Sequence, residues 1–319
     1  MSADGAMRVL VTGGAGFIGA NLCRRLAADR GVAEVVALDD LSTGFRSNLD
    51  GIAGVRFVLG SVLDPAVLRD AMSGVSAVVH LAARPSVPRS VADPLASNRV
   101  NVDGTLSVLE SARRQQHVPF VVFASSSSVY GSNSETPKHE GLATYPRSPY
   151  GASKLAGEAY TLAYQDSYGM PTLAFRFFNV FGPLQAPGHA YAAVVPTFVD
   201  SALRRVPLPV HGDGLQTRDF TYVATVADVI ARALVGRRSS ARPVNLAFGS
   251  RVSLIDLIGL LEQLVGHPLE REHQPMRAGD VRDSQADNSA LRALFPDVEP
   301  IELGEGLAET IRWMESRVA

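Results

Sequence analysis

Short apolar runs alternate with longer amphipathic stretches through the first half of the chain. The apolar runs lie at residues 8–11, 34–38, 55–59, 77–80 and 120–124. Stretches with apolar side chains three to four residues apart lie between them, at residues 17–29, 65–72 and 93–116. A three-to-four spacing predicts a helix, and apolar runs without alternation predict strands that are covered on both faces. The first half therefore predicts a doubly wound α/β fold with a parallel sheet.

The second half has a different character. A helix is predicted from residue 149 to residue 168, followed by a strand at 172–177. After about residue 180, clusters of glycine and proline separate shorter elements. The elements expected there are helices at 191–204, 226–236, 254–265 and 304–317 and a strand at 244–247. We therefore expect a first domain over residues 1–180 and a smaller α/β lobe over residues 181–319, with some segments that cross back.

The composition narrows the class of protein. The 319 residues carry 30 Lys and Arg against 32 Asp and Glu, and 46% are hydrophobic. Balanced charge is typical of a compact globular protein and disfavours a nucleic-acid partner, which needs a basic surface. The single cysteine, Cys23, cannot form an intramolecular disulfide or a cysteine-based metal site. Because no apolar run reaches the ~18 residues of a membrane span and no signal-peptide core precedes the first strand, we expect a cytoplasmic protein with no membrane partner.

Three glycines follow the first predicted strand. Gly13, Gly16 and Gly19 lie in the segment TGGAGFIG, directly before a predicted helix. In a dinucleotide-binding turn, the first glycine allows the tight turn, the second lets the backbone approach a pyrophosphate, and the third lets the helix pack on the sheet. The N-terminus of that helix stabilises the negative charge. A plain turn also produces such a triplet, so the strand and helix around it decide the interpretation.

An acidic residue stands where a dinucleotide-binding fold needs one. Asp39 follows Gly19 by twenty residues, at the end of the second predicted strand. A carboxylate there accepts hydrogen bonds from both ribose hydroxyls of an adenosine and repels a 2′-phosphate. The glycines and Asp39 together predict a site for NAD rather than NADP.

A tyrosine and a lysine stand four residues apart near the start of a predicted helix. This spacing places Tyr150 and Lys154 on one helix face. On an arbitrary helix such a pair is usually a surface pair. Beside an NAD site a base is required, because a hydride cannot leave a carbon that carries a hydroxyl group unless another group accepts the hydroxyl proton. An ammonium group close to a phenol lowers the pKa of the phenol and makes it a usable base near neutral pH. Four serines at 125–128 end the fifth predicted strand, where a hydroxyl can bond both substrate and base.

In combination, these segments resemble the extended short-chain dehydrogenase/reductase family, and within it the NAD-dependent nucleotide-sugar 4-epimerases. The resemblance covers nearly the whole chain, from Val9 to about Trp313. It is carried by the segments TGGAGFIG (12–19), LDDLSTG (38–44), HLAA (80–83), SVPRS (86–90), SSSSVYG (125–131), SPYGASK (148–154), RFFNVFGP (176–183), GDGLQTRDFTYV (212–223) and RAGDVRDSQAD (277–287).

The resemblance implies a 4-epimerase of UDP-hexoses, which oxidises C4 transiently and returns the hydride to the other face of the sugar. Tyr150 and Lys154 are then the catalytic pair, and Ser126 is the hydroxyl that orients the substrate. NAD is the implied cofactor and stays bound, because the net redox change is zero. Such enzymes usually form homodimers through the two helices that correspond here to residues 93–116 and 149–168.

The resemblance also assigns binding residues. Those implied to contact NAD are Gly13, Gly16, Phe17, Ile18, Gly19, Asp39, Asp40, Gly44, Ser61, Val62, Leu81, Ala82, Ala83, Tyr150, Lys154 and Phe177. Those implied to bind the UDP-sugar are Ser86, Ser126, Asn179, Gln185, Ala193, Val195, Arg218, Arg277, Asp280 and Ser284. Arg218 and Arg277 offer fork-shaped donors that suit a diphosphate. No histidine lies at a metal-ligand spacing, so no metal site is expected.

One small residue indicates the sugar preference. Ser284 lies seven residues after Arg277, at a position that faces the C2 substituent of the sugar in the related epimerases. A bulky aromatic there fills the room that a 2-acetamido group needs. The segments 86–90, 190–196 and 279–287 also resemble the subgroup that acts on N-acetylhexosamines or their uronic acids. We therefore expect interconversion of UDP-GlcNAc and UDP-GalNAc.

The chain departs from the family pattern at two positions. Ser61 stands where an aspartate commonly contacts the adenine amine, and Pro85 lies beside the sugar pocket at a position that is usually not proline. The related 4,6-dehydratases carry Asp-Glu after their catalytic threonine, whereas Ser127 and Ser128 follow Ser126 here, which disfavours dehydration. The alternatives are a UDP-glucose or UDP-uronate 4-epimerase, a nucleotide-sugar dehydratase, reductase or decarboxylase, and a catalytically silent NAD-binding regulator.

Overall fold

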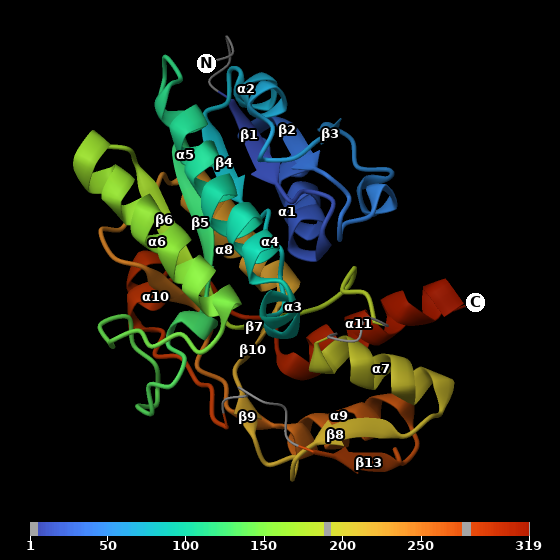
Figure 1. Cartoon of the computed structure of the whole chain (residues 1–319). Helices are drawn as coiled ribbons and strands as arrows, with labels where there is room; N and C mark the ends of the chain where they lie inside the picture. Colours follow the sequence, from blue (N-terminus) through green and yellow to red (C-terminus); the bar gives the residue numbers. More distant parts are fainter. Residues whose placement is uncertain (1–5, 188–192, 276–281, 319) are drawn as a thin grey trace.

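A seven-stranded parallel sheet organises the fold (Figure 1). It is seen in a computed structural model that describes residues 6–187, 193–275 and 282–318. The strand order is β11 (Val244–Leu246), β6 (Thr172–Phe177), β5 (Phe120–Ser126), β4 (Ala77–His80), β1 (Met7–Thr12), β2 (Val32–Asp39) and β3 (Val55–Leu59). Every neighbouring pair in this sheet is parallel. This is the doubly wound Rossmann arrangement, and it confirms the predicted fold class.

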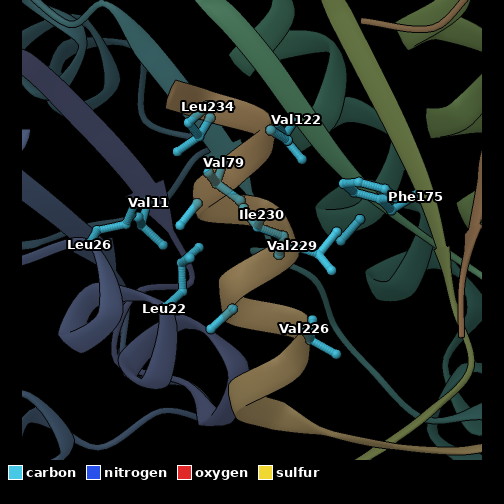
Figure 2. Packing of buried hydrophobic residues seen from close by; sticks show 14 of the residues in the cluster. Val11, Leu22, Leu26, Val79, Val122, Phe175, Val226, Val229, Ile230 and Leu234 are labelled. Carbon is cyan, nitrogen blue, oxygen red and sulfur yellow. The ribbon is translucent and has the colours of Figure 1, made fainter. Parts of the chain in front are cut away.

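Helices cover both faces of the sheet. Because successive residues of a strand point to opposite sides, each strand contributes side chains to the core on both faces. The main helices of one face are α1 (Phe17–Ala27) and α8 (Val223–Val235). Those of the other face are α2 (Pro65–Met72), α5 (Gly104–Arg113) and α6 (Pro149–Tyr168). Val11 of β1 lies in the core with Leu22 and Ile230 on the first face (Figure 2), whereas Leu10 shares the core of the second face with Leu68.

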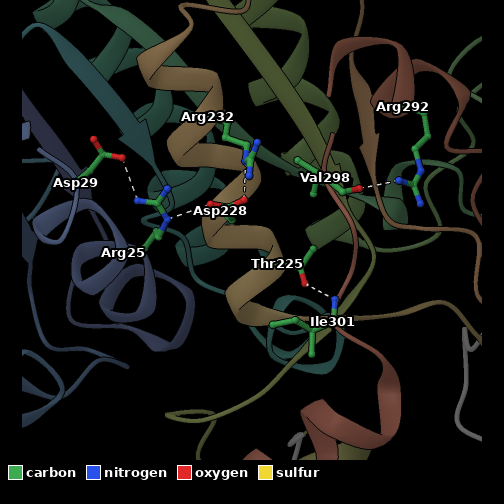
Figure 3. A network of polar contacts seen from close by, with 8 residues as sticks. All are labelled: Arg25, Asp29, Thr225, Asp228, Arg232, Arg292, Val298 and Ile301. Atoms are coloured by element: carbon green, nitrogen blue, oxygen red, sulfur yellow. Dashed lines mark hydrogen bonds and ion pairs between the residues drawn. The ribbon is translucent and has the colours of Figure 1, made fainter. Parts of the chain in front are cut away.

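Although α8 follows residue 180 in the chain, it belongs to the layers of the sheet. Arg25 of α1 forms ion pairs with Asp29 and with Asp228 of α8, and Asp228 also pairs with Arg232 (Figure 3). Strand β11, at the edge of the sheet, also comes after residue 180. The sheet and the helices that cover it therefore contain segments from before and from after residue 180.

A smaller lobe lies below the sheet in the view of Figure 1. Its helices are α7 (Val194–Arg204), α9 (Leu254–Val265) and α11 (Leu303–Val318). Its paired strands are β8 (Leu208–His211) with β13 (Arg271–Gln274), and β9 (Thr217–Arg218) with β12 (Val252–Ser253). A further pair, β7 (Asn179–Phe181) with β10 (Phe220–Tyr222), lies beside it. Phe198, Leu257 and Leu307 bring the three helices into one buried core.

The helix expected over residues 93–116 is divided in the structure. It consists of α4 (Pro94–Asn98), a π-helical turn (Arg99–Asp103) and α5. The wide turn buries Asn101, whose side chain bonds to the backbone of Arg84.

Three further differences concern helix boundaries and short elements. The helix expected at 191–204 begins at Val194, and residues 191 and 192 lie outside the described part of the chain. The helix expected to start at residue 226 starts at Val223. The short strands of the smaller lobe and α3 (Val87–Ala92) were not predicted, because elements of two to six residues are too short to show a clear periodic pattern.

Candidate active site

A cavity of about 650 Å³ lies between the sheet and the smaller lobe. It is located at the carboxyl ends of β1 and β4, where the strand order reverses and where doubly wound sheets bind their ligands. The predicted site residues in its lining are Gly13, Gly16, Phe17, Ile18, Gly19, Asp39, Asp40, Ser61, Val62, Leu81, Ala82, Ala83, Ser86, Ser126, Tyr150, Lys154, Phe177, Asn179, Gln185, Ala193, Val195 and Arg218.

Two predicted site residues that the structure describes, Gly44 and Ser284, are not part of this lining. A Cβ on Gly44 would lie 2.8 Å from the carbonyl carbon of Ala15, so this glycine lets its loop pack behind the glycine-rich turn and does not reach the cavity. The amide of Ser284 donates to the carbonyl of Thr217 at 3.1 Å, which holds this half-buried residue beside β9. The predicted site residues Arg277 and Asp280 lie outside the described residues.

The turn after β1 has the shape that a dinucleotide requires. Gly13 has a φ of +71°, and a Cβ there would lie 2.8 Å from the amide nitrogen of Ala82. A Cβ on Gly19 would lie 2.0 Å from the carbonyl oxygen of Gly13, so only glycine fits at either position. Gly16 caps α1, whose first turn lines the cavity and presents the positive end of its helix dipole there. The turn can therefore hold a pyrophosphate.

Asp39 at the end of β2 is fixed by the same turn. Its two carboxylate oxygens accept hydrogen bonds from the amides of Ala15 at 3.0 Å and Leu41 at 2.8 Å. Burial raises the pKa of Asp39, and these amide bonds oppose the shift. A carboxylate can accept further hydrogen bonds beyond these, and Asp39 lines the cavity, so it suits the ribose hydroxyls of an adenosine.

Ser126, Tyr150 and Lys154 meet on one wall of the cavity. Burial raises the pKa of the Tyr150 phenol, and a hydrogen bond with the side chain of Ser126 opposes that shift. Burial also lowers the pKa of Lys154 to about 8, and its Nζ donates to the carbonyl of Ala124 at 2.8 Å. A charge in such a dry position acts strongly on its neighbours, so the Lys154 ammonium can stabilise a phenolate.

A buried ion pair lies directly behind this wall. Arg176 of β6 and Glu158 of α6 are each 4% exposed and form two hydrogen bonds, at 2.6 and 3.0 Å. The hydroxyl of Ser125 donates to the same Glu158 carboxylate. The pair therefore joins β5, β6 and α6 behind Ser126.

His80 at the end of β4 belongs to a chain of buried hydrogen bonds. Thr105 donates its hydroxyl to the carbonyl of Asn101 at 2.7 Å, so its oxygen accepts from His80 Nε2 at 3.0 Å. His80 Nδ1 then accepts from Thr12 at 2.7 Å, and the Thr12 oxygen accepts from the amide of Ala82. Burial lowers the pKa of His80 to about 3. His80 is therefore a neutral structural residue that holds the loop after β4.

The smaller lobe contributes Arg218 to the cavity. Its neighbour Asp219 is fully buried, and the Asp219 carboxylate accepts hydrogen bonds from the amides of Gly249 and Ala286 and from the hydroxyl of Ser250. Burial raises the pKa of Asp219 to about 6. Asp219 thereby ties three segments of the lobe together and fixes the backbone that carries Arg218.

The lining contains one polar atom without a partner among the described residues and several polar residues that the sequence did not predict. Gln185 donates to the carbonyl of Val180 at 3.3 Å, while its buried Oε1 has no hydrogen-bond partner among the described residues. That oxygen can accept a bond from a ligand. The sequence did not predict Thr197, His211 or Gln216, which also line the cavity. Gln216 lies inside the segment 212–223, whose resemblance to the family could have identified it as a site residue. Thr197 and His211 lie outside the segments that carry the resemblance.

The part of the chain that the structure describes contains neither a membrane-spanning helix nor a cluster of metal ligands. No helix within residues 6–187, 193–275 and 282–318 is both long and apolar enough to span a membrane. In the same part of the chain, no cluster of histidine, cysteine and acidic side chains could hold a metal ion.

The cavity is lined by a glycine-rich turn and an acidic residue that suit a dinucleotide, and by Tyr150 and Lys154. Residues 9–247 match the model of the NAD dependent epimerase/dehydratase family. The chain belongs to this family. A curated relative, the UDP-glucose 4-epimerase of Mycolicibacterium smegmatis, is 37% identical over 317 residues, which cover 98% of this chain and 99% of the relative.

Solved structures of the family have the same fold. The UDP-N-acetylglucosamine 4-epimerase from Methanobrevibacter ruminantium, in complex with UDP-N-acetylmuramic acid, superimposes with a TM-score of 0.91 at 34% identity, over 98% of this chain and 99% of that chain. The UDP-glucose 4-epimerase of Thermus thermophilus, in complex with NAD, gives a TM-score of 0.86 at 34% identity, over 97% and 99%. The chain is thus an enzyme of this family, and NAD is its cofactor.

Proposed function

We propose that this enzyme is a 4-epimerase of UDP-hexoses. The observation that carries the proposal is that one cavity is lined by Asp39 and the glycine turn, by Tyr150, and by Arg218 of the smaller lobe. Such a cavity suits a dinucleotide and a nucleotide sugar that meet at a general base. The names of the relatives support the same activity.

Bound NAD supplies a reversible acceptor for the hydrogen at C4 of the sugar. Tyr150 accepts the proton of the 4-hydroxyl and later returns it, which is the role of a general acid and base. Ser126 orients that hydroxyl through the hydrogen bond it shares with Tyr150. Lys154 keeps a positive charge beside the phenol and so favours its ionised form.

The smaller lobe binds the nucleotide part of the substrate. Arg218 brings to the diphosphate a guanidinium that is held in place by bonds from its Nη1 to the carbonyls of Thr217 and Arg282, and Asn179 adds an amide. Ala193 and Val195 form an apolar wall that suits a uracil ring. The sequence resemblance assigns Arg277, which lies outside the described residues, to the same diphosphate.

The sugar is an N-acetylhexosamine, as in UDP-GlcNAc and UDP-GalNAc. Ser284 lies outside the lining itself but is bonded to Thr217, the neighbour of the lining residue Arg218, and a small residue there leaves room for the 2-acetamido group. Ser284→Tyr should suppress turnover of the acetylated sugars and spare UDP-Gal, because overpacking a rigid site costs about 1–3 kcal/mol, roughly a 5- to 150-fold loss. Ser284→Ala is the matched control, since it removes the hydroxyl but keeps the space. An unchanged ratio of acetylated to plain sugars in Ser284→Tyr contradicts the assignment.

A dehydratase is the second candidate, since this activity occurs in the same family. It needs an acid and a base after the catalytic hydroxyl, and the chain has Ser127 and Ser128 at those positions. Mass spectrometry of the products separates the alternatives: an epimerase conserves the mass of the UDP-sugar, a dehydratase loses water and a decarboxylase loses carbon dioxide. A silent NAD-binding protein gives no product.

The enzyme acts as a homodimer in this proposal. Val91 of α3 and Leu95 of α4 are 64% and 82% exposed, and Tyr160 of the neighbouring α6 is 40% exposed. Apolar side chains on adjacent helices are typical of a surface that a second copy covers. Sedimentation of the protein at micromolar concentration tests this, and a species at the monomer mass of 33.9 kDa contradicts it.

A further inference from the structure

The segment from Arg84 to Ser90, which contains the loop that faces the sugar in the proposed function, is joined to the backbone of Tyr150 by two hydrogen-bonded links, one direct and one through Asn101 and Ser153. Pro85, Ser86 and Val87 of this loop line the cavity between the end of β4 and α3. Ser90 forms one link, to the amide of Tyr150. The other link runs to the carbonyl of the same residue. None of these bonds involves the phenol, so they have no part in the proton transfer described above.

Ser90 provides the first link. It is completely buried, its oxygen accepts from the amide of Tyr150 at 3.0 Å, and its hydroxyl donates to the carbonyl of Val87 at 2.7 Å. Tyr150 lies in the first turn of α6, where backbone amides have no partner within the helix. Ser148 caps the amide of Gly151 in the same turn. Ser90 therefore acts as a cap supplied by another segment, and it fixes the end of α6 that carries the base.

Asn101 provides the second link from the π-helical turn. Its Nδ2 donates to Ser153 Oγ at 2.9 Å, and Ser153 donates to the carbonyl of Tyr150 at 2.8 Å. The Asn101 side chain also accepts from the amide of Arg84 at 2.7 Å and donates to the carbonyl of Arg84 at 3.3 Å. Single π-helical turns are frequent at functional sites. This one joins the start of the sugar-facing loop to α6.

The backbone between the two links is strained. Ser86 has φ +92° and ψ +121°, a conformation that residues other than glycine rarely adopt. Such a conformation persists only where the surroundings determine it, and it is found mainly at active sites and ligand clamps. Asn101 fixes Arg84 on one side of Ser86, and Ser90 fixes the other side.

We infer that Ser90 and the Asn101–Ser153 pair form a two-point clamp that positions the Tyr150 base against the loop that holds the sugar. These are positioning residues, since they act through the backbone of Tyr150. The inference rests on the proposed 4-epimerase activity for its kinetic test only. A base and its substrate must be held within a fraction of an ångström, and misplacement by about 1 Å can cost 10²-fold in rate.

Kinetics of Ser90→Ala and Ser153→Ala test the clamp. Each should lower kcat for the UDP-sugar by about 10- to 100-fold with little change in KM, because the nucleotide is bound elsewhere. Ser97→Ala is the matched control: Ser97 is completely buried in α4 and donates to the carbonyl of Asp93 of its own segment. In the Tyr150→Phe background, Ser90→Ala should cause no further loss, since the phenol it positions is absent.

Three kinetic results overturn the inference. The first is a loss in Ser90→Ala that is no larger than in Ser97→Ala. The second is an effect confined to KM. The third is a full additional loss in the Tyr150→Phe background, because it shows that Ser90 acts without the phenol.

A spectroscopic test keeps the clamp separate from the proposed activity. In protein labelled with ¹³Cζ-tyrosine, the Tyr150 signal is the one that disappears in Tyr150→Phe. This signal should shift in Ser90→Ala at fixed pH and stay in place in Ser97→Ala. A wild-type enzyme that inverts no UDP-sugar at C4 contradicts the proposed function alone, whereas an unmoved Tyr150 signal in Ser90→Ala contradicts the clamp alone.

Discussion

The hydroxyl of Ser125 lies 2.6 Å from the carboxylate of Glu158, to which it donates. Both side chains are buried, and Glu158 also pairs with Arg176. The one proton of the Ser125 hydroxyl is therefore committed to a structural pair. Ser126 bonds to the phenol of Tyr150 and accepts from the amide of Ser128. The structure thus separates two adjacent serines that the sequence could not distinguish by pattern alone.

Substitution of each serine should have a different effect. Ser126→Ala should lower kcat roughly tenfold, the equivalent of one lost hydrogen bond in the transition state. Ser125→Ala should retain kcat but lower the free energy of unfolding by about 1–3 kcal/mol, because Glu158 loses a buried partner. Steady-state kinetics and urea unfolding measure the two effects. Equal losses of kcat in both variants refute the assignment.

Tyr150→Phe should remove nearly all turnover and leave substrate binding almost intact. In the proposed function the phenol acts on a proton, whereas Arg218 and its lobe hold the nucleotide. We expect a loss of about 10²–10⁴-fold in kcat, as for other general acid–base groups. Calorimetric titration with UDP-sugar should give a Kd within a few-fold of wild type. If Tyr150→Phe keeps most of its kcat, another group is the base.

Asp39→Ala should weaken retention of the cofactor. The carboxylate lies at the ribose end of the cavity and is positioned by the amides of Ala15 and Leu41. Wild-type protein should release NAD(H) when it is denatured, and Asp39→Ala should release clearly less. Asp50→Ala is a control, because Asp50 is exposed and outside the lining. A wild-type protein that holds no NAD(H) and depends on added NADP contradicts the role given to Asp39.

His80 should make the fold sensitive to acid. Burial lowers its pKa from 6.5 to about 3, so between these values the unfolded chain binds a proton that the folded chain does not. Its contribution to stability is therefore complete above pH 6.5 and is lost as the pH falls toward 3. The free energy of unfolding should fall by about 2 kcal/mol between pH 6.5 and pH 5 through this residue. Urea unfolding of wild type and His80→Gln at both pH values measures it, and equal slopes in the two proteins refute it.

The sequence predicted the parts of the site that depend on short-range patterns. Gly13, Gly19 and Asp39 follow strand ends at fixed spacings, and Tyr150 and Lys154 share one turn of a helix. The role of each of these residues can therefore be predicted from the short segment in which it lies.

Other features depend on contacts between distant segments. Ser90 bonds to a residue 60 positions away, and Asn101 reaches Ser153 across 52 positions. The π-helical turn around Asn101 leaves the apolar spacing of residues 93–116 almost unchanged, so the pattern predicts one continuous helix. The buried chain of hydrogen bonds through His80 could not be predicted either, because its members come from distant segments and each one by itself has the pattern of an ordinary core residue.

The most direct test of the account is to incubate purified protein with UDP-GlcNAc, UDP-GalNAc, UDP-Glc and UDP-Gal, without added NAD, and to score the C4 configuration of the products by NMR. The account predicts inversion at C4 with unchanged mass, for the acetylated sugars at least as well as for the plain ones, and none with Tyr150→Phe. No inversion at C4 for any of the four sugars would contradict it.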